Sequence, residues 1–172
     1  IDIEVQSDEG FPEPDQANYP VTTICTKSSK EEFFRVWGLG EYTAKENCIY
    51  TQCNSELQLL EQFLDYWQNH GSPDIVTGWN TKQFDIPYLV NRTRKVIGEE
   101  SIKRFSPWGT VSSRTIRGKM GMKDVDTYDL MGIAKLYYYD LFRKFTGNTL
   151  GQQESYRLDH LANVVLGESN QS

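Results

Sequence analysis

The segment Ile1-Asp2-Ile3-Glu4-Val5 alternates apolar and acidic side chains at the start of the 172-residue chain. Side chains two residues apart on a β-strand point to the same face, so a strand over 1–5 would present Asp2 and Glu4 side by side. Charge placed in an apolar strand requires compensation, which bound cations provide. The segment therefore predicts a buried strand that carries a pair of carboxylates.

A second acidic segment, Gly78-Trp79-Asn80-Thr81-Lys82-Gln83-Phe84-Asp85, follows a short apolar run over 74–78. Asp85 lies where this predicted strand gives way to a helix, a position from which a side chain can reach across the end of a sheet. Carboxylates suit Mg²⁺ or Mn²⁺, and two such ions about 4 Å apart can bind both oxygens of an in-line phosphoryl displacement. We therefore predict that Asp2, Glu4 and Asp85 converge as catalytic and metal-binding residues.

The remaining pattern predicts a single α/β domain over 1–172, with a mixed sheet flanked by helices. Strands over 21–26 and 33–38 would form an antiparallel meander with the first strand, and strands over 74–78 and 133–139 would follow later. The predicted helices run from an N-cap at Asn54 to Gly71, over 86–98, 140–145 and 156–166, and an extended hairpin is predicted over 105–126.

The charge is distributed unevenly along the chain. The formal net charge is −6, but residues 92–123 carry +7 and the remainder −13. This charge distribution fits a protein that binds phosphates along one edge and has an acidic metal centre elsewhere. A solvated basic surface would show the same composition.

The cysteine content and the hydropathy of the chain indicate the cellular compartment in which we expect the protein. Three cysteines without paired spacing indicate neither a disulfide framework nor a zinc site, and a reducing cytoplasm is expected. No apolar run approaches the roughly 20 residues that a membrane helix needs, and no signal pattern opens the chain. We therefore expect a cytoplasmic protein that has no membrane partner.

Two motifs occur in order and at a suitable spacing. The first is Asp2-Ile3-Glu4 followed by Gly10-Phe11-Pro12-Glu13-Pro14, and the second is Thr77-Gly78-Trp79-Asn80 with Phe84-Asp85-Ile86-Pro87-Tyr88-Leu89 and Asn91-Arg92. Together they resemble the 3′→5′ proofreading exonuclease domain of family B DNA polymerases, particularly those of T-even-like bacteriophages. The resemblance covers the chain from Asp2 to about Gly167.

This resemblance implies a ribonuclease H-like fold and two-metal hydrolysis of the 3′-terminal phosphodiester of single-stranded DNA. By it, Asp2 would bridge both ions, Glu4 would bind one ion and orient the attacking water, and Asp85 would hold the second ion. Asn80 would contact the strand near its 3′ end, and Phe11 would wedge against the terminal bases.

The basic segment matches the place where the family has a protruding β-hairpin that helps to part primer from template. Its residues Arg114, Arg117 and Lys119 are therefore expected to contact DNA. The expected partners are the primer 3′ end and the rest of a polymerase chain.

The sequence departs from the family at a third motif, a Tyr followed four residues later by an Asp, because no tyrosine here has that neighbour. Since the chain also begins inside its first predicted strand, we expect a domain truncated at both ends, folded but with little or no turnover in isolation. Two alternatives stay open: a catalytically incomplete nucleic-acid-binding fragment, and an exonuclease of the same fold that acts on RNA.

Overall fold

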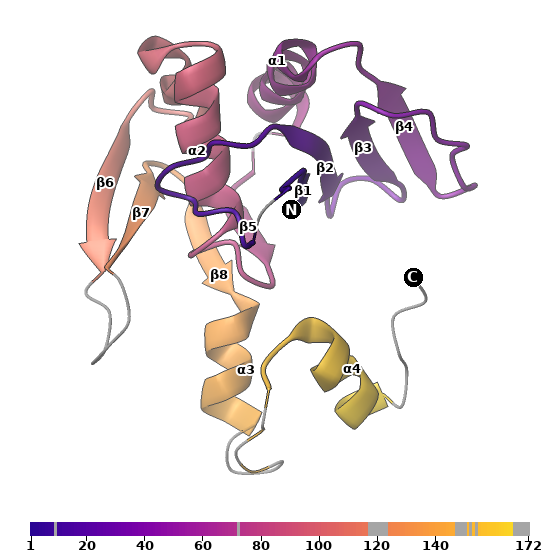
Figure 1. The fold of residues 1–172 in the computed structure, drawn as a ribbon, viewed down its shortest axis with the longest axis vertical. Coiled ribbons are helices and arrows are strands. Elements are labelled where there is room, and N and C mark those ends of the chain that lie inside the picture. Colours follow the sequence, from indigo (N-terminus) through magenta and orange to yellow (C-terminus); the bar gives the residue numbers. More distant parts are fainter. Residues whose placement is uncertain are drawn as a thin grey trace.

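The computed structural model describes residues 1–8, 10–71, 73–116, 124–146, 151, 153 and 155–166. Within them, a four-stranded sheet has the order β1 (Asp2–Val5), β2 (Val21–Lys27), β3 (Phe34–Gly38) and β4 (Cys48–Gln52) (Figure 1). The first three strands form the predicted antiparallel meander. Strand β4 was not predicted, and it pairs parallel with β3, so this sheet is mixed.

Helix α1 (Glu56–Tyr66) covers one face of this sheet and continues into a π-helical turn over Trp67–Gly71. The N-cap is Ser55, whose side chain accepts the Gln58 N–H, so the predicted cap at Asn54 is wrong by one residue. The Asn54 N–H instead donates to the Gln58 side chain at 2.7 Å. Apolar side chains of α1 and the sheet contribute to the core, together with those of later elements, and the rings of Trp37 and Phe63 lie 5.6 Å apart.

Strand β5 (Ile75–Gly78) pairs parallel with β8 (Ala134–Tyr137) in a separate two-stranded sheet. The Ile1 amino group donates to the Thr77 carbonyl at 2.9 Å, which brings β5 next to β1. A Cβ at Gly78 would lie 2.5 Å from the Ile1 carbonyl oxygen and would also meet Thr81, so only glycine permits this approach.

Helix α2 (Asp85–Val96) lies between the four-stranded sheet and the antiparallel pair of β6 (Val111–Ile116) and β7 (Val125–Leu130) (Figure 1). It starts one residue before the predicted Ile86 and ends ahead of Gly98, whose φ of 130° favours glycine. A 3₁₀-helix over Glu99–Phe105, absent from the sequence prediction, follows it.

The chain then enters β8 and two helices, α3 (Tyr138–Thr146) and α4 (Leu158–Leu166). Helix α3 begins two residues before the predicted Asp140, and α4 starts two residues after the predicted 156. No helix in the part of the chain that the structure describes is both long and apolar enough to cross a bilayer.

Among the residues that the structure describes, the strands of the predicted single mixed sheet are divided into three sheets. The strand pair β6–β7 falls partly within the hairpin predicted over 105–126, but residues 117–123 lie outside the described ones. The protruding hairpin and the ribonuclease H-like fold therefore stay predictions, while the mixed α/β class agrees with the structure.

Candidate active site

Asp2 and Glu4 lie on the exposed face of β1, while Ile3 between them is buried, with 5% of its surface exposed. The alternation arises because successive strand residues point to opposite faces and the apolar one packs against the core. The predicted same-face arrangement of the two acids is confirmed.

Asp85 occupies the first turn of α2 and is 3% exposed. Its Oδ1 accepts the backbone N–H of Ile3 at 3.1 Å, across 82 residues of sequence. The structure thus brings Asp85 to the backbone of β1, at the residue that separates Asp2 from Glu4.

The charge of Asp2 acts on the other two carboxylates. Burial, followed by the negative charge of Asp2, raises the pKa of Asp85 from 3.8 to about 7, although the Ile3 N–H opposes this change. Burial and the Asp2 charge also raise the pKa of Glu4 above its ordinary value. A nearby negative charge disfavours ionisation of an acid, so both shifts fit carboxylates clustered around Asp2.

Among the described residues, no group of three or more His, Cys, Asp or Glu side chains has an arrangement that could hold a metal ion. The chemistry of Asp2, Glu4 and Asp85 nevertheless fits a hard cation, because all three offer carboxylate oxygens. Their joint role as metal ligands stays a prediction.

Phe11 lies in the loop between β1 and β2, with 70% of its surface exposed. Its ring centroid is 5.1 Å from that of Phe84, the residue before Asp85. An apolar ring is therefore held open to solvent next to the second acidic motif, where it can stack on a base.

Asn80 lies in the turn after β5, where its carbonyl accepts the N–H groups of Gln83 and Phe84. It borders a cavity of about 560 Å³ between this turn and the C-terminal helices, lined by Trp79, Asn80, Gln83, Tyr139, Ser155, Tyr156, Arg157 and Leu158. The sequence analysis did not single out Tyr139 or Tyr156 for this role. The run of tyrosines at 137–139 was the available signal for Tyr139, which lies in the first turn of α3.

Arg114 lies on β6 opposite Thr127 and is exposed. A hydrogen bond from Lys135, with a smaller contribution from the Arg114 charge, lowers the pKa of Asp129. The other two predicted DNA contacts, Arg117 and Lys119, lie outside the described residues.

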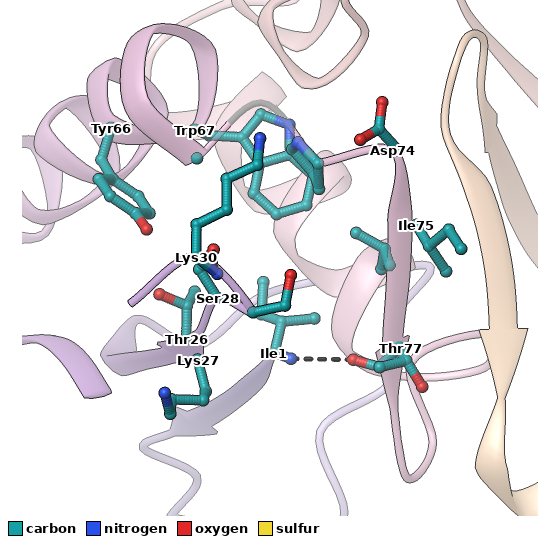
Figure 2. A pocket seen from close by; sticks show the side chains of 14 residues that line it. Ile1, Thr26, Lys27, Ser28, Lys30, Tyr66, Trp67, Asp74, Ile75 and Thr77 are labelled. Atoms are coloured by element: carbon teal, nitrogen blue, oxygen red, sulfur yellow. Dashed lines mark hydrogen bonds between the residues drawn. The ribbon is translucent and has the colours of Figure 1, made fainter. Parts of the chain in front are cut away.

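A second cavity, of about 370 Å³, lies beside β5 and contains none of the predicted site residues. Figure 2 shows Lys30, Trp67 and Ile75 around it, with the bond between Ile1 and Thr77 at one side. The candidate active site is therefore the acidic face of β1 with Asp85, not this hollow.

Cys25 pairs with Asp2 in the register of β1 and β2, a proximity that the sequence analysis missed. Burial, with a smaller contribution from the Asp2 charge, raises the pKa of its thiol above the ordinary value. A register prediction for the meander would have found it.

Comparisons with known proteins agree with these features. Residues 1–161 match the family model of the DNA polymerase family B exonuclease domain. The chain is 34% identical to the DNA-directed DNA polymerase of Escherichia phage RB69 and 33% identical to that of Enterobacteria phage T4, with 96% and 94% of the chain covered. It is also 30% identical, over 65% of its length, to the DNA polymerase delta catalytic subunit of Mesocricetus auratus.

The chain spans about a fifth of the length of the two phage relatives, at 21% and 20%. The family match covers nearly all of the chain and includes both acidic motifs. This chain therefore belongs to the exonuclease domain family of the family B DNA polymerases.

Proposed function

We propose that this domain is the 3′→5′ proofreading exonuclease of a DNA-directed DNA polymerase, and that it hydrolyses the 3′-terminal phosphodiester of single-stranded DNA in the host cytoplasm. The observation that carries the proposal is the placement of Asp85 against the β1 backbone between Asp2 and Glu4. The negative charge of Asp2 raises the pKa of Asp85, so the two acids lie close enough to repel each other, and a bound cation would offset this repulsion.

In the proposed mechanism, Asp2, Glu4 and Asp85 hold Mg²⁺ or Mn²⁺ within a ribonuclease H-like fold. Bound divalent ions would supply an activated water and stabilise the leaving 3′-oxyanion. Asp2 and Glu4 face solvent, where they could approach the substrate phosphate and orient a water. Asp85 is buried and would offer its carboxylate to an ion from the protein side.

The 3′ end of the DNA would be held by residues that flank Asp2, Glu4 and Asp85. Phe11 stacks on a terminal base, and Asn80 binds the strand from the turn after β5. Selection acts on frayed ends rather than on sequence, because a mismatched terminus unstacks at a lower energetic cost than a paired one. Arg114, with Arg117 and Lys119, would contact backbone phosphates.

A second candidate is a nucleic-acid-binding fragment without turnover. It is favoured by the excess of positive charge over residues 92–123, which can bind phosphates without any metal chemistry. An exonuclease acting on RNA is the third.

Matched DNA and RNA oligonucleotides separate these functions when turnover by the full-length protein is measured with Mg²⁺, Mn²⁺ or EDTA. We expect metal-dependent release of nucleoside monophosphates from DNA and its loss in Asp85→Asn. Glu100→Gln is the control, because its carboxylate is exposed and lies beyond the opposite end of α2. Preferred cleavage of RNA, or equal activity in Asp85→Asn, would reject the proposal.

A further inference from the structure

One face of α2 holds the backbone of the loop that carries Phe11. Residues at positions i, i+3, i+4 and i+7 of a helix share a face. Four such side chains donate to loop carbonyls: Tyr88 to Tyr19 at 2.8 Å, Asn91 to Pro14 at 3.0 Å, Arg92 to Ala17 at 3.0 Å, and Lys95 to Gln16. The loop over 14–19 is therefore fixed to a rigid element.

The same face of α2 reaches Phe11 through aromatic contacts. The Phe84 ring lies 5.1 Å from that of Phe11 and 5.5 Å from that of Tyr88. Because Phe84 stands four residues before Tyr88, the exposed Phe11 ring lies at the N-terminal end of this row of side chains.

Asn91 is the point where this row meets β7. Its Oδ1 accepts hydrogen bonds from Tyr128 Oη and from Arg94 Nη1, both at 2.6 Å, while its Nδ2 donates to Pro14. Asn91 and Tyr128 are 7% and 6% exposed, so bulk water cannot readily replace a lost hydrogen-bond partner of either residue. Leaving one of these buried groups unpaired would cost about 1–3 kcal/mol.

Tyr128 also fixes the position of β6, since β7 pairs with β6 and Tyr128 stands opposite Ser113, next to Arg114. The Asn91 amide is thus a hydrogen-bonded bridge from the Phe11 loop to the strand pair that carries Arg114. The hydrogen bonds to the loop and to β7 can be removed separately, because Asn91 Nδ2 binds the loop and Asn91 Oδ1 binds Tyr128 on β7.

We propose that Asn91 is a positioning residue that couples the Phe11 loop to the β6–β7 pair. The coupling keeps the ring that meets the terminal base and the basic strand that meets the backbone at a fixed spacing while a frayed end is separated from its template. This inference rests on the proposed exonuclease function for its purpose, but the coupling itself has a readout that needs no activity.

The first test is hydrogen exchange of the backbone amides of residues 15–19 in the full-length protein, since Pro14 has no N–H. Tyr128→Phe removes the hydroxyl that donates to Asn91 and accepts from Arg94 on the β7 side. We nevertheless expect it to speed exchange in the loop by about 3- to 10-fold, the effect of one net hydrogen bond across the bridge. Tyr66→Phe is the matched control, because it removes a hydroxyl that donates to Glu31 elsewhere. Unchanged exchange in Tyr128→Phe would overturn the coupling, whatever the nuclease activity.

The second test compares kcat/KM on a mismatched primer–template with kcat/KM on a single-stranded oligonucleotide. Asn91→Asp keeps the Oδ1 acceptor but replaces the donor to Pro14 with a carboxylate oxygen that repels the Pro14 carbonyl, so it breaks the bridge on the loop side. We expect Asn91→Asp and Tyr128→Phe each to lower the duplex to single-strand ratio by about 3- to 10-fold. The double variant should fall no further than the more affected single variant, because both changes break one bridge.

A loss of equal size on both substrates, or an unchanged ratio with faster loop exchange, would show a merely structural role and overturn the positioning role. A wild-type protein that is inactive on single-stranded DNA while Tyr128→Phe still loosens the loop would instead reject the proposed function and leave the coupling in place.

Discussion

The Ile3 N–H donates to Asp85 Oδ1 at 3.1 Å and so joins the first strand to the first turn of α2. Within the described residues, strand β1 pairs with β2 along one edge, and Asp85 satisfies a donor on its other edge. Asp85 therefore has two roles: it holds β1 against α2, and it contributes the buried carboxylate of the candidate site.

Replacing Asp85 with Asn should abolish exonuclease turnover while leaving the fold intact. An amide keeps an acceptor for Ile3 but loses the negative charge, so the loss should exceed the roughly 10- to 100-fold that changes around a metal ligand produce. Single-turnover hydrolysis with Mn²⁺ measures the loss, with Glu100→Gln as control. A variant within a few-fold of wild type would remove Asp85 from the catalytic set.

Stability without divalent metal should fall as the pH rises. The pKa of Asp85 is about 7 in the folded state and 3.8 ordinarily, so the folded state binds more protons between these values. The contribution of Asp85 to the free energy of unfolding is therefore fully present below about pH 4. It is lost as the pH rises through about 7, and the loss is at most about 4 kcal/mol. Urea unfolding in EDTA at pH 5.5 and 8 measures this loss.

Asp85→Asn supplies the control for this pH dependence, because it should flatten the slope and raise stability at pH 8. The raised pKa of Glu4 acts in the same direction, so a small residual slope is expected. Equal slopes in wild type and Asp85→Asn would contradict the assignment.

Gly78→Ala should weaken the contact between β5 and β1. The new Cβ would lie 2.5 Å from the Ile1 carbonyl oxygen, so the strands must separate, at a cost of about 1–3 kcal/mol as for other overpacked sites. Gly40→Ala is the matched control, because a Cβ there meets no atom within 4 Å. Equal unfolding midpoints for the two variants would show that the strands tolerate the group.

Phe11→Ala should raise the KM for single-stranded DNA with little change in kcat. The ring is 70% exposed, and stacking of one base on such a ring contributes about 1–3 kcal/mol, or 5- to 150-fold in affinity. Phe34→Ala, which removes a ring 40% exposed on β3, is the control. An unaltered KM in Phe11→Ala would assign this ring to anchoring its own loop.

Arg114→Ala should weaken DNA binding and reduce the slope of log affinity against log salt by about 0.7, the value for one phosphate contact on a single strand. Arg104→Ala is the control, since its guanidinium is already held by Glu61 and Asp65. Titrations between 50 and 200 mM salt, about the range over which phosphate contacts are lost, measure both slopes. Parallel lines for Arg114→Ala and wild type would exclude a phosphate contact.

The sequence by itself determined the features that depend on local geometry. The period of two in a strand fixed the common face of Asp2 and Glu4, and the change to helical spacing after Gly78 placed Asp85 at the start of α2 to within one residue. The antiparallel meander followed for the same reason, because alternating apolar residues bounded by turn formers specify short strands.

Only the tertiary structure decided the relations between distant segments. The parallel pairing of β4, the division into three sheets, the raised pKa of Asp85 and the bridge through Asn91 all depend on which surfaces exclude water together. Desolvation and hydrogen-bond geometry arise when the packed elements meet, and residue spacing along one element carries no information about them.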